Sequence, residues 1–88
     1  MPYNKLASTT GGVVQGNQLS AMPGYTLVKG PNNTVSAMQV GGGLGLTVDC
    51  ICMHGGTGNC VPQVESDVAV CNKSPDLPCN SSCAFLFK

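Results

Sequence analysis

LGLTVDCICMH, residues Leu44–His54, carries the strongest structural pattern in this chain. In an extended chain every second residue lies on one face, and here that face consists of Leu44, Leu46, Val48, Cys50, Cys52 and His54. Alternation with a period of two is typical of a β-strand that turns one side toward a core. No cysteine precedes Cys50, and all six cysteines lie from there onward. We therefore expect this strand to join a half without disulfides to a half held together by them.

The length of 88 residues corresponds to a single small domain, residues 1–88. Residues 1–43 are expected to form an N-terminal arm and β-hairpins without disulfides, and residues 44–88 the central strand and a cysteine-rich half. Six cysteines in so short a chain indicate three disulfides, or fewer with a bound metal. We expect an all-β fold: a small disulfide-stapled sheet or sandwich with turns rich in Gly, Pro and Asn, and little or no helix.

The cysteines also indicate the environment of the protein. All six are expected in disulfides whose pairing is left open: Cys50, Cys52, Cys60, Cys71, Cys79 and Cys83. Disulfides form in oxidising compartments, so we expect an extracellular or cell-surface location. The start of the chain lacks the basic and apolar regions of a signal peptide, which predicts a processed terminus or another export route. No stretch approaches the ~20 apolar residues of a membrane-spanning helix, so we expect no membrane insertion.

Charge is scarce in this chain, with 9% of residues charged and a net charge of zero. A nucleic-acid interface needs clustered cations, and the four lysines are scattered, so we expect no nucleic-acid partner. A soluble monomer usually keeps a net charge on its surface to resist association. The composition therefore favours copies of the same chain as the partner. We expect no cofactor and no small-molecule ligand.

Short strands are expected on both sides of the central stretch, separated by turns rich in Gly, Pro and Asn. They cover residues 13–15, 25–29, 34–40 and 64–71. A single helical turn over residues 36–39 is the competing prediction. The segment Asn17–Met22 (NQLSAM) nearly recurs as Asn33–Met38 (NTVSAM). This recurrence is either a coincidence or a duplicated hairpin unit.

Both ends of the chain contain candidates for assembly. Tyr3 and Leu6 are the candidate anchors of a polar N-terminal segment, which is either a frayed arm or a strand added to a neighbouring subunit. The C-terminal run contains Phe85, Leu86 and Phe87 and is apolar on both faces of a strand. Such a strand must be covered by its own domain or by another chain.

Cys50, Cys52 and His54 form the one set of residues with the character of metal ligands. Thiolate and imidazole suit Zn(II) or Cu(I), although the repeated C-x-x-C spacing of zinc sites is absent. Cysteines two apart on a strand lie about 6–7 Å apart and cannot readily bond to each other. They need other cysteines or a shared metal as partners. Disulfides are the leading interpretation and a metal is the alternative.

Several functions are compatible with this pattern. The leading hypothesis is a structural, self-assembling subunit of an extracellular filament, appendage or coat, built by strand pairing and disulfides. The first alternative is a monomeric disulfide-rich secreted binding module or inhibitor that uses the Gly55–Asn59 or Pro75–Pro78 loop. A thiol- and histidine-based metal-binding protein and a precursor of a modified peptide are further alternatives. No residue pattern marks an activated nucleophile, so we expect no enzymatic activity.

Overall fold

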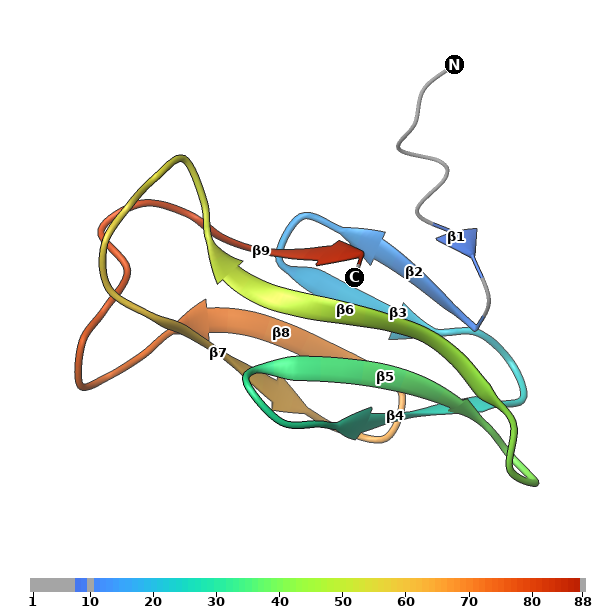
Figure 1. Ribbon diagram of the computed structural model, residues 1–88. Coiled ribbons are helices and arrows are strands. Elements are labelled where there is room, and N and C mark those ends of the chain that lie inside the picture. Colours follow the sequence, from blue (N-terminus) through green and yellow to red (C-terminus); the bar gives the residue numbers. More distant parts are fainter. Residues whose placement is uncertain (1–7, 10, 88) are drawn as a thin grey trace, which may run out of the picture.

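The computed structural model describes residues 8–9 and 11–87. These residues form nine β-strands and no helix, and the strands make two antiparallel sheets that pack face to face (Figure 1). The prediction of an all-β, disulfide-stapled fold is confirmed. Within the same described ranges, no helix is long and apolar enough to cross a membrane.

Each sheet combines strands from both halves of the chain. The first sheet has the order β1-β2-β3-β8-β7. Its strands are β1 (Ser8–Thr9), β2 (Gly12–Gln15), β3 (Gln18–Ala21), β8 (Val68–Lys73) and β7 (Cys60–Val64). The second sheet has the order β4-β5-β6-β9. Its strands are β4 (Tyr25–Lys29), β5 (Thr34–Gln39), β6 (Leu44–Cys52) and β9 (Cys83–Phe87).

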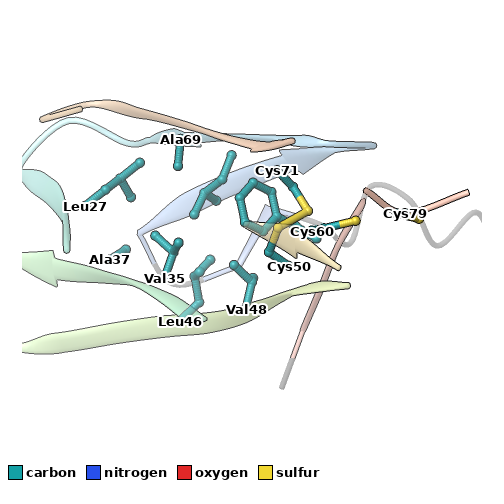
Figure 2. Close-up of a cluster of buried hydrophobic side chains, with 12 residues drawn as sticks. Leu27, Val35, Ala37, Leu46, Val48, Cys50, Cys60, Ala69, Cys71 and Cys79 are labelled. Atoms are coloured by element: carbon teal, nitrogen blue, oxygen red, sulfur yellow. A yellow bond between two sulfur atoms is a disulfide. The ribbon is translucent and has the colours of Figure 1, made fainter. Parts of the chain in front are cut away.

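The core lies between the two sheets and is lined by alternate residues of their strands (Figure 2). Its aliphatic and aromatic members are Leu19, Leu27, Val35, Ala37, Leu46, Val48, Ala69 and Phe85. Four buried cysteines complete it: Cys50, Cys60, Cys71 and Cys79. Because one face of every central strand is buried, the alternation of apolar and polar residues fixes which side of each strand points inward.

Leu44 does not belong to the inward face of β6, and this part of the sequence prediction is wrong. Its side chain is 66% exposed. Ser36 pairs with Thr47, whereas Met38 pairs with Leu44, so β6 contains one extra residue between these two positions. Such a bulge reverses the alternation, and Leu44 therefore shares the outer face with Met38.

The central strand also ends earlier than expected, at Cys52. His54 lies beyond it, is exposed, and has a positive φ of 57°. A residue with this backbone conformation cannot continue a β-strand. His54 is therefore in the loop that follows β6, and its predicted place on the inward face is wrong.

The predicted strand over residues 64–71 is replaced by a hairpin between β7 and β8 that turns at residues 65–67. Pro62 lies inside β7 and pairs with Cys71. Proline is tolerated there because β7 is an edge strand, and the Cys71 N–H donates instead to the carbonyl of Asn17. β5 ends at Gln39, and the alternative helical turn over residues 36–39 is not formed.

The recurring six-residue segments occupy corresponding places in the two sheets. One supplies β3, which pairs with β8, and the other supplies β5, which pairs with β6. The carbonyl of Asn17 accepts the Cys71 N–H at 2.8 Å, and the carbonyl of Asn33 accepts the Cys50 N–H at 2.9 Å. Cys50 and Cys71 are bonded to each other. The recurrence in sequence thus has a structural counterpart on both sides of one disulfide.

Candidate functional site

All six cysteines are paired in three disulfides: Cys50–Cys71, Cys52–Cys79 and Cys60–Cys83. The first cysteine in the chain pairs with the fourth, the second with the fifth and the third with the sixth. Their Cα atoms lie 5.4, 5.7 and 5.9 Å apart, within the usual range for disulfides. Because Cys50 and Cys52 point the same way from one strand, each reaches a partner on a different element.

Two of the disulfides link the sheets and the third anchors a loop. Cys50–Cys71 joins β6 to β8 through the core, where Figure 2 shows its sulfur–sulfur bond. Cys60–Cys83 joins β7 to β9, also across the two sheets. Cys52–Cys79 ties β6 to the segment of residues 74–82 between β8 and β9. The three disulfides therefore hold one end of the sandwich together.

The sulfur atoms of different disulfides are close neighbours. The Sγ atoms of Cys52, Cys60 and Cys79 all lie within 4.8 Å of one another. The same limit holds for the Sγ atoms of Cys60, Cys71 and Cys83. Cys60 belongs to both sets, so the Cys60–Cys83 disulfide lies between the other two. We refer to these five cysteines as the sulfur cluster.

The structure does not bring Cys50, Cys52 and His54 together as a metal site. His54 and Cys50 belong to neither set of neighbouring ligand atoms among the described residues. Cys50 and Cys52 are each bonded to another cysteine. A metal is bound by the thiolate form of cysteine, which a disulfide does not offer. In the paired state, these residues thus act as cross-links.

The two loops that the sequence singled out are held against each other next to the Cys52–Cys79 disulfide. The Asn59 N–H donates to the carbonyl of Leu77 at 2.7 Å, and the Asn80 N–H donates to the carbonyl of Thr57 at 2.9 Å. The Thr57 N–H in turn donates to the Asn80 side-chain oxygen at 3.0 Å. We call residues 54–59 and 74–82 the joined loops. Leu77 is 57% exposed on them.

Gly58 makes the close approach of the joined loops possible. It has a φ of +98°, and a Cβ atom there would overlap the carbonyl oxygen of Pro78. Gly55, in the same loop, also has a positive φ, but a Cβ atom there would meet nothing within 4 Å. Glycine is thus required at Gly58 by both conformation and space, and at Gly55 by conformation alone.

We expect Gly58→Ala to lower the free energy of unfolding by about 3 kcal/mol, from backbone strain and overpacking together. Gly55→Ala, the matched control, is expected to cost about 1 kcal/mol, from strain alone. Urea unfolding of the two oxidised variants measures the difference. Equal losses for both variants would mean that the joined loops do not depend on the contact at Gly58.

The terminal residues predicted to mediate assembly fall into three groups. Tyr3 and Leu6 lie outside the described residues. Phe85 is 2% exposed and packs in the core, so its side chain is not available to a neighbouring molecule. Leu86 and Phe87 are 45% and 44% exposed, at the end of β9. β9 itself pairs with β6 in its own sheet.

The outer face of the first sheet was not recognised from the sequence. The outward positions of β2, β3, β7 and β8 are occupied by Val13, Gln15, Gln18, Ser20, Val61, Gln63, Val68, Val70 and Asn72. None of these nine residues is charged. Val70 lies between Gln18 and Gln63 on the neighbouring strands. We call this surface the valine–glutamine face. Its residues come from two distant parts of the chain, and only the pairing of β3 with β8 brings them together.

Comparison with known proteins adds no relative: no family model matches this chain, no curated protein is detectably similar to it, and no solved structure matches it.

Proposed function

We propose that this protein is a structural subunit of an extracellular filament, appendage or coat, and that it assembles with copies of itself. The valine–glutamine face carries this proposal. Soluble proteins usually place charges of both signs on an exposed sheet to resist association. Nine adjacent outward positions without a charge, on a chain whose net charge is zero, offer no such protection.

The chemistry of the face is suited to contact with an identical face. Burying its valines removes apolar surface from water, and glutamine side chains can donate and accept hydrogen bonds across the contact. No unpaired charge is desolvated when two such faces meet. With a strand spacing of about 4.8 Å and a rise of about 3.3 Å per residue, four strands give a face of only a few hundred Å². One contact of this size is weak, so stable assembly requires repeated contacts.

Hydrogen bonds within the chain favour contact through this face over contact through the sheet edges. The Leu27 N–H of β4 donates to the carbonyl of Ser66 at 3.1 Å, and the Phe85 N–H of β9 donates to the carbonyl of Gly16 at 3.0 Å. β7 carries Pro62, which has no N–H. One central donor on each of these three edges is thus occupied or missing, which limits strand addition. We therefore propose face-to-face assembly in place of the strand pairing expected from the sequence.

A lysine in the centre of the valine–glutamine face is expected to prevent assembly. In Val70→Lys, association would bring like charges together and desolvate them. Val28→Lys is the matched control, because Val28 is an exposed valine on the other sheet. Sedimentation velocity over a range of concentrations, with negative-stain microscopy, is expected to show large species for the wild type and Val28→Lys and a monomer for Val70→Lys. A wild type that stays monomeric at every concentration would contradict the proposal.

The proposed location follows from the same features. Three disulfides indicate an oxidising, extracellular-type environment. We propose that the protein acts outside the cell or on its surface, and that its role is mechanical and not enzymatic. The disulfides contribute covalent links within each subunit, so an assembly built from it would resist local unfolding.

A second function, the binding of another protein by a monomer, is favoured by the joined loops. A disulfide and several backbone hydrogen bonds hold these loops, and Leu77 projects from them. A rigid loop with an exposed apolar side chain loses little entropy when it binds a pocket on a partner. The sedimentation experiment separates the two functions, because a monomer with three intact disulfides at all concentrations supports the second.

A further inference from the structure

The sulfur cluster contains two alternative sets of disulfide partners. In the structure, Cys52 is bonded to Cys79 and Cys60 to Cys83. Exchanging the partners would give Cys52–Cys83 and Cys60–Cys79. We propose that an external small-molecule thiol, such as glutathione, converts the first set into the second, with Cys52 or Cys83 as the site of attack. This inference is independent of self-assembly.

Each alternative pair lies in, or directly next to, a backbone pairing that the structure already contains. Cys52 and Cys83 are directly opposite each other on β6 and β9. The Met53 N–H, one residue on, donates to the carbonyl of Ser82. Cys52 and Cys83 are therefore a non-hydrogen-bonded pair of the antiparallel ladder. The Cα atoms of such a pair lie about 4.5 Å apart. This distance is within the range that a disulfide spans.

The other alternative pair lies next to a short parallel bridge. Asn59 is bridged to Pro78, and Cys60 and Cys79 are the residues that follow them. The Cys79 N–H donates to the carbonyl of Asn59 at 3.2 Å. The Sγ atoms of Cys60 and Cys79 are within 4.8 Å of each other. The backbone of this pair is thus already held in place for a disulfide.

Exposure determines where the reaction begins. Cys52 and Cys83 are half-buried, whereas Cys60 and Cys79 are buried. Thiol–disulfide exchange proceeds by attack of a thiolate on a sulfur that it can reach. An external thiolate is therefore expected to attack Cys52 and form a mixed disulfide, and the Cys79 thiolate is released inside the cluster.

The remaining steps balance without any net oxidation or reduction. The Cys79 thiolate attacks Cys60, which forms the Cys60–Cys79 bond, breaks Cys60–Cys83 and releases the Cys83 thiolate. The Cys83 thiolate then attacks Cys52 in the mixed disulfide, which forms Cys52–Cys83 and regenerates the external thiolate. Attack at Cys83 in place of Cys52 leads to the same products by the mirror sequence of steps.

The exchange changes which parts of the fold are covalently linked. In the structure, two disulfides connect the sheets, Cys50–Cys71 and Cys60–Cys83. After exchange, Cys52–Cys83 lies within the second sheet and Cys60–Cys79 links β7 to the joined loops. Only Cys50–Cys71 then connects the sheets. The segment of residues 74–82 is then no longer bonded to β6, which alters the surface that carries Leu77.

The variant Cys79→Ser tests the last internal step, the formation of the Cys52–Cys83 bond, without added thiol. It leaves Cys52 as a free thiol opposite Cys83 on the neighbouring strand. Attack on Cys83 would form Cys52–Cys83 and move the free thiol to Cys60. We expect alkylation in denaturant after an acid quench, followed by mass spectrometry, to find at least as much label on Cys60 as on Cys52. Label confined to Cys52 would overturn the proposal.

Cys71→Ser is the matched control. It frees Cys50, which belongs to neither set of neighbouring sulfurs, so the label is expected to remain on Cys50. Label spread over all cysteines in this control would indicate general scrambling and would count against a built-in exchange site.

The wild-type protein provides a second measurement that does not depend on the folding of a variant. It is incubated with a substoichiometric amount of reduced glutathione, quenched with acid and digested with pepsin. Fragmentation of the linked peptides is expected to show Cys52–Cys83 and Cys60–Cys79, with Cys50–Cys71 retained. Recovery of the starting pairs alone, with or without a glutathione adduct, would contradict the inference.

Discussion

Simultaneous replacement of Cys50 and Cys71 by alanine is expected to lower the free energy of unfolding by about 4 kcal/mol. The disulfide closes a loop between residues 21 positions apart, and its loss increases the entropy of the unfolded chain by an amount equivalent to about 3 kcal/mol. Both residues are buried, so the lost sulfur atoms also leave a small cavity worth about 1 kcal/mol. A domain of 88 residues has a total stability of roughly 4–13 kcal/mol, so this loss is a large part of it.

The double variant Cys52→Ala/Cys79→Ala is the control for the entropic contribution to this loss in the free energy of unfolding. Its residues are 27 positions apart, so the loop term is nearly the same, about 3 kcal/mol. Cys52 is only half-buried and lies toward the joined loops, so we expect a smaller packing loss. Urea unfolding of both oxidised variants, followed by circular dichroism, measures the two losses. If removing Cys50–Cys71 cost no more than 1 kcal/mol, the disulfide would not be the main link between the sheets.

Phe85→Ala is expected to be the most destabilising single substitution in the C-terminal strand, with a loss of about 3–5 kcal/mol. Phe85 is opposite Cys50 on β6 and fills the core beside the sulfur cluster. Among the buried core residues that the structure describes, Phe85 is the one with an aromatic ring. A small shift of a similar side chain therefore cannot fill the cavity. Such a cavity costs both the transfer free energy and the lost contacts.

Phe87→Ala is the matched control, because it removes the same side chain two residues further along the same strand. Phe87 is 44% exposed, and we expect a loss of about 1 kcal/mol or less. Differential scanning calorimetry of the two oxidised variants compares the midpoint temperatures of their thermal unfolding. Similar losses of stability for the two variants would show that the Phe85 side chain of β9 does not fill the core. A change in sedimentation for Phe87→Ala alone would assign this residue to assembly.

Three strands of the N-terminal half, β2, β4 and β5, were predictable because their patterns are local, whereas β3 was missed. Tyr25–Lys29 is rich in strand-forming residues and is closed by a Gly-Pro-Asn-Asn turn, and it forms β4 with those bounds. The hairpin between β7 and β8 was missed because valines on both sides of its turn continue one alternating pattern. A turn made of Glu65, Ser66 and Asp67 contains no Gly or Pro to mark it.

The candidate site was only partly predictable. The sequence placed Cys50 and Cys52 on one face of a strand, and the structure agrees. It also grouped His54 with them, which failed because the strand ends at Cys52 and the chain turns away. The valine–glutamine face was not predicted because its strands are far apart in the sequence. Neither the composition nor the hydrophobic period of a strand identifies the strand that pairs with it.

By itself, the sequence determined the all-β class, the inward orientation of Leu46, Val48 and Cys50, and the presence of enough cysteines for three disulfides. These features depend on the period of two and on composition, which are local properties of the chain. Only the tertiary structure decided the disulfide partners, the bulge that turns Leu44 outward, and the meeting of the two loops beside Cys52–Cys79. Six cysteines allow 15 sets of three disulfides. Which set forms depends on the distances between cysteines in the folded sandwich, and a local sequence pattern does not determine these distances.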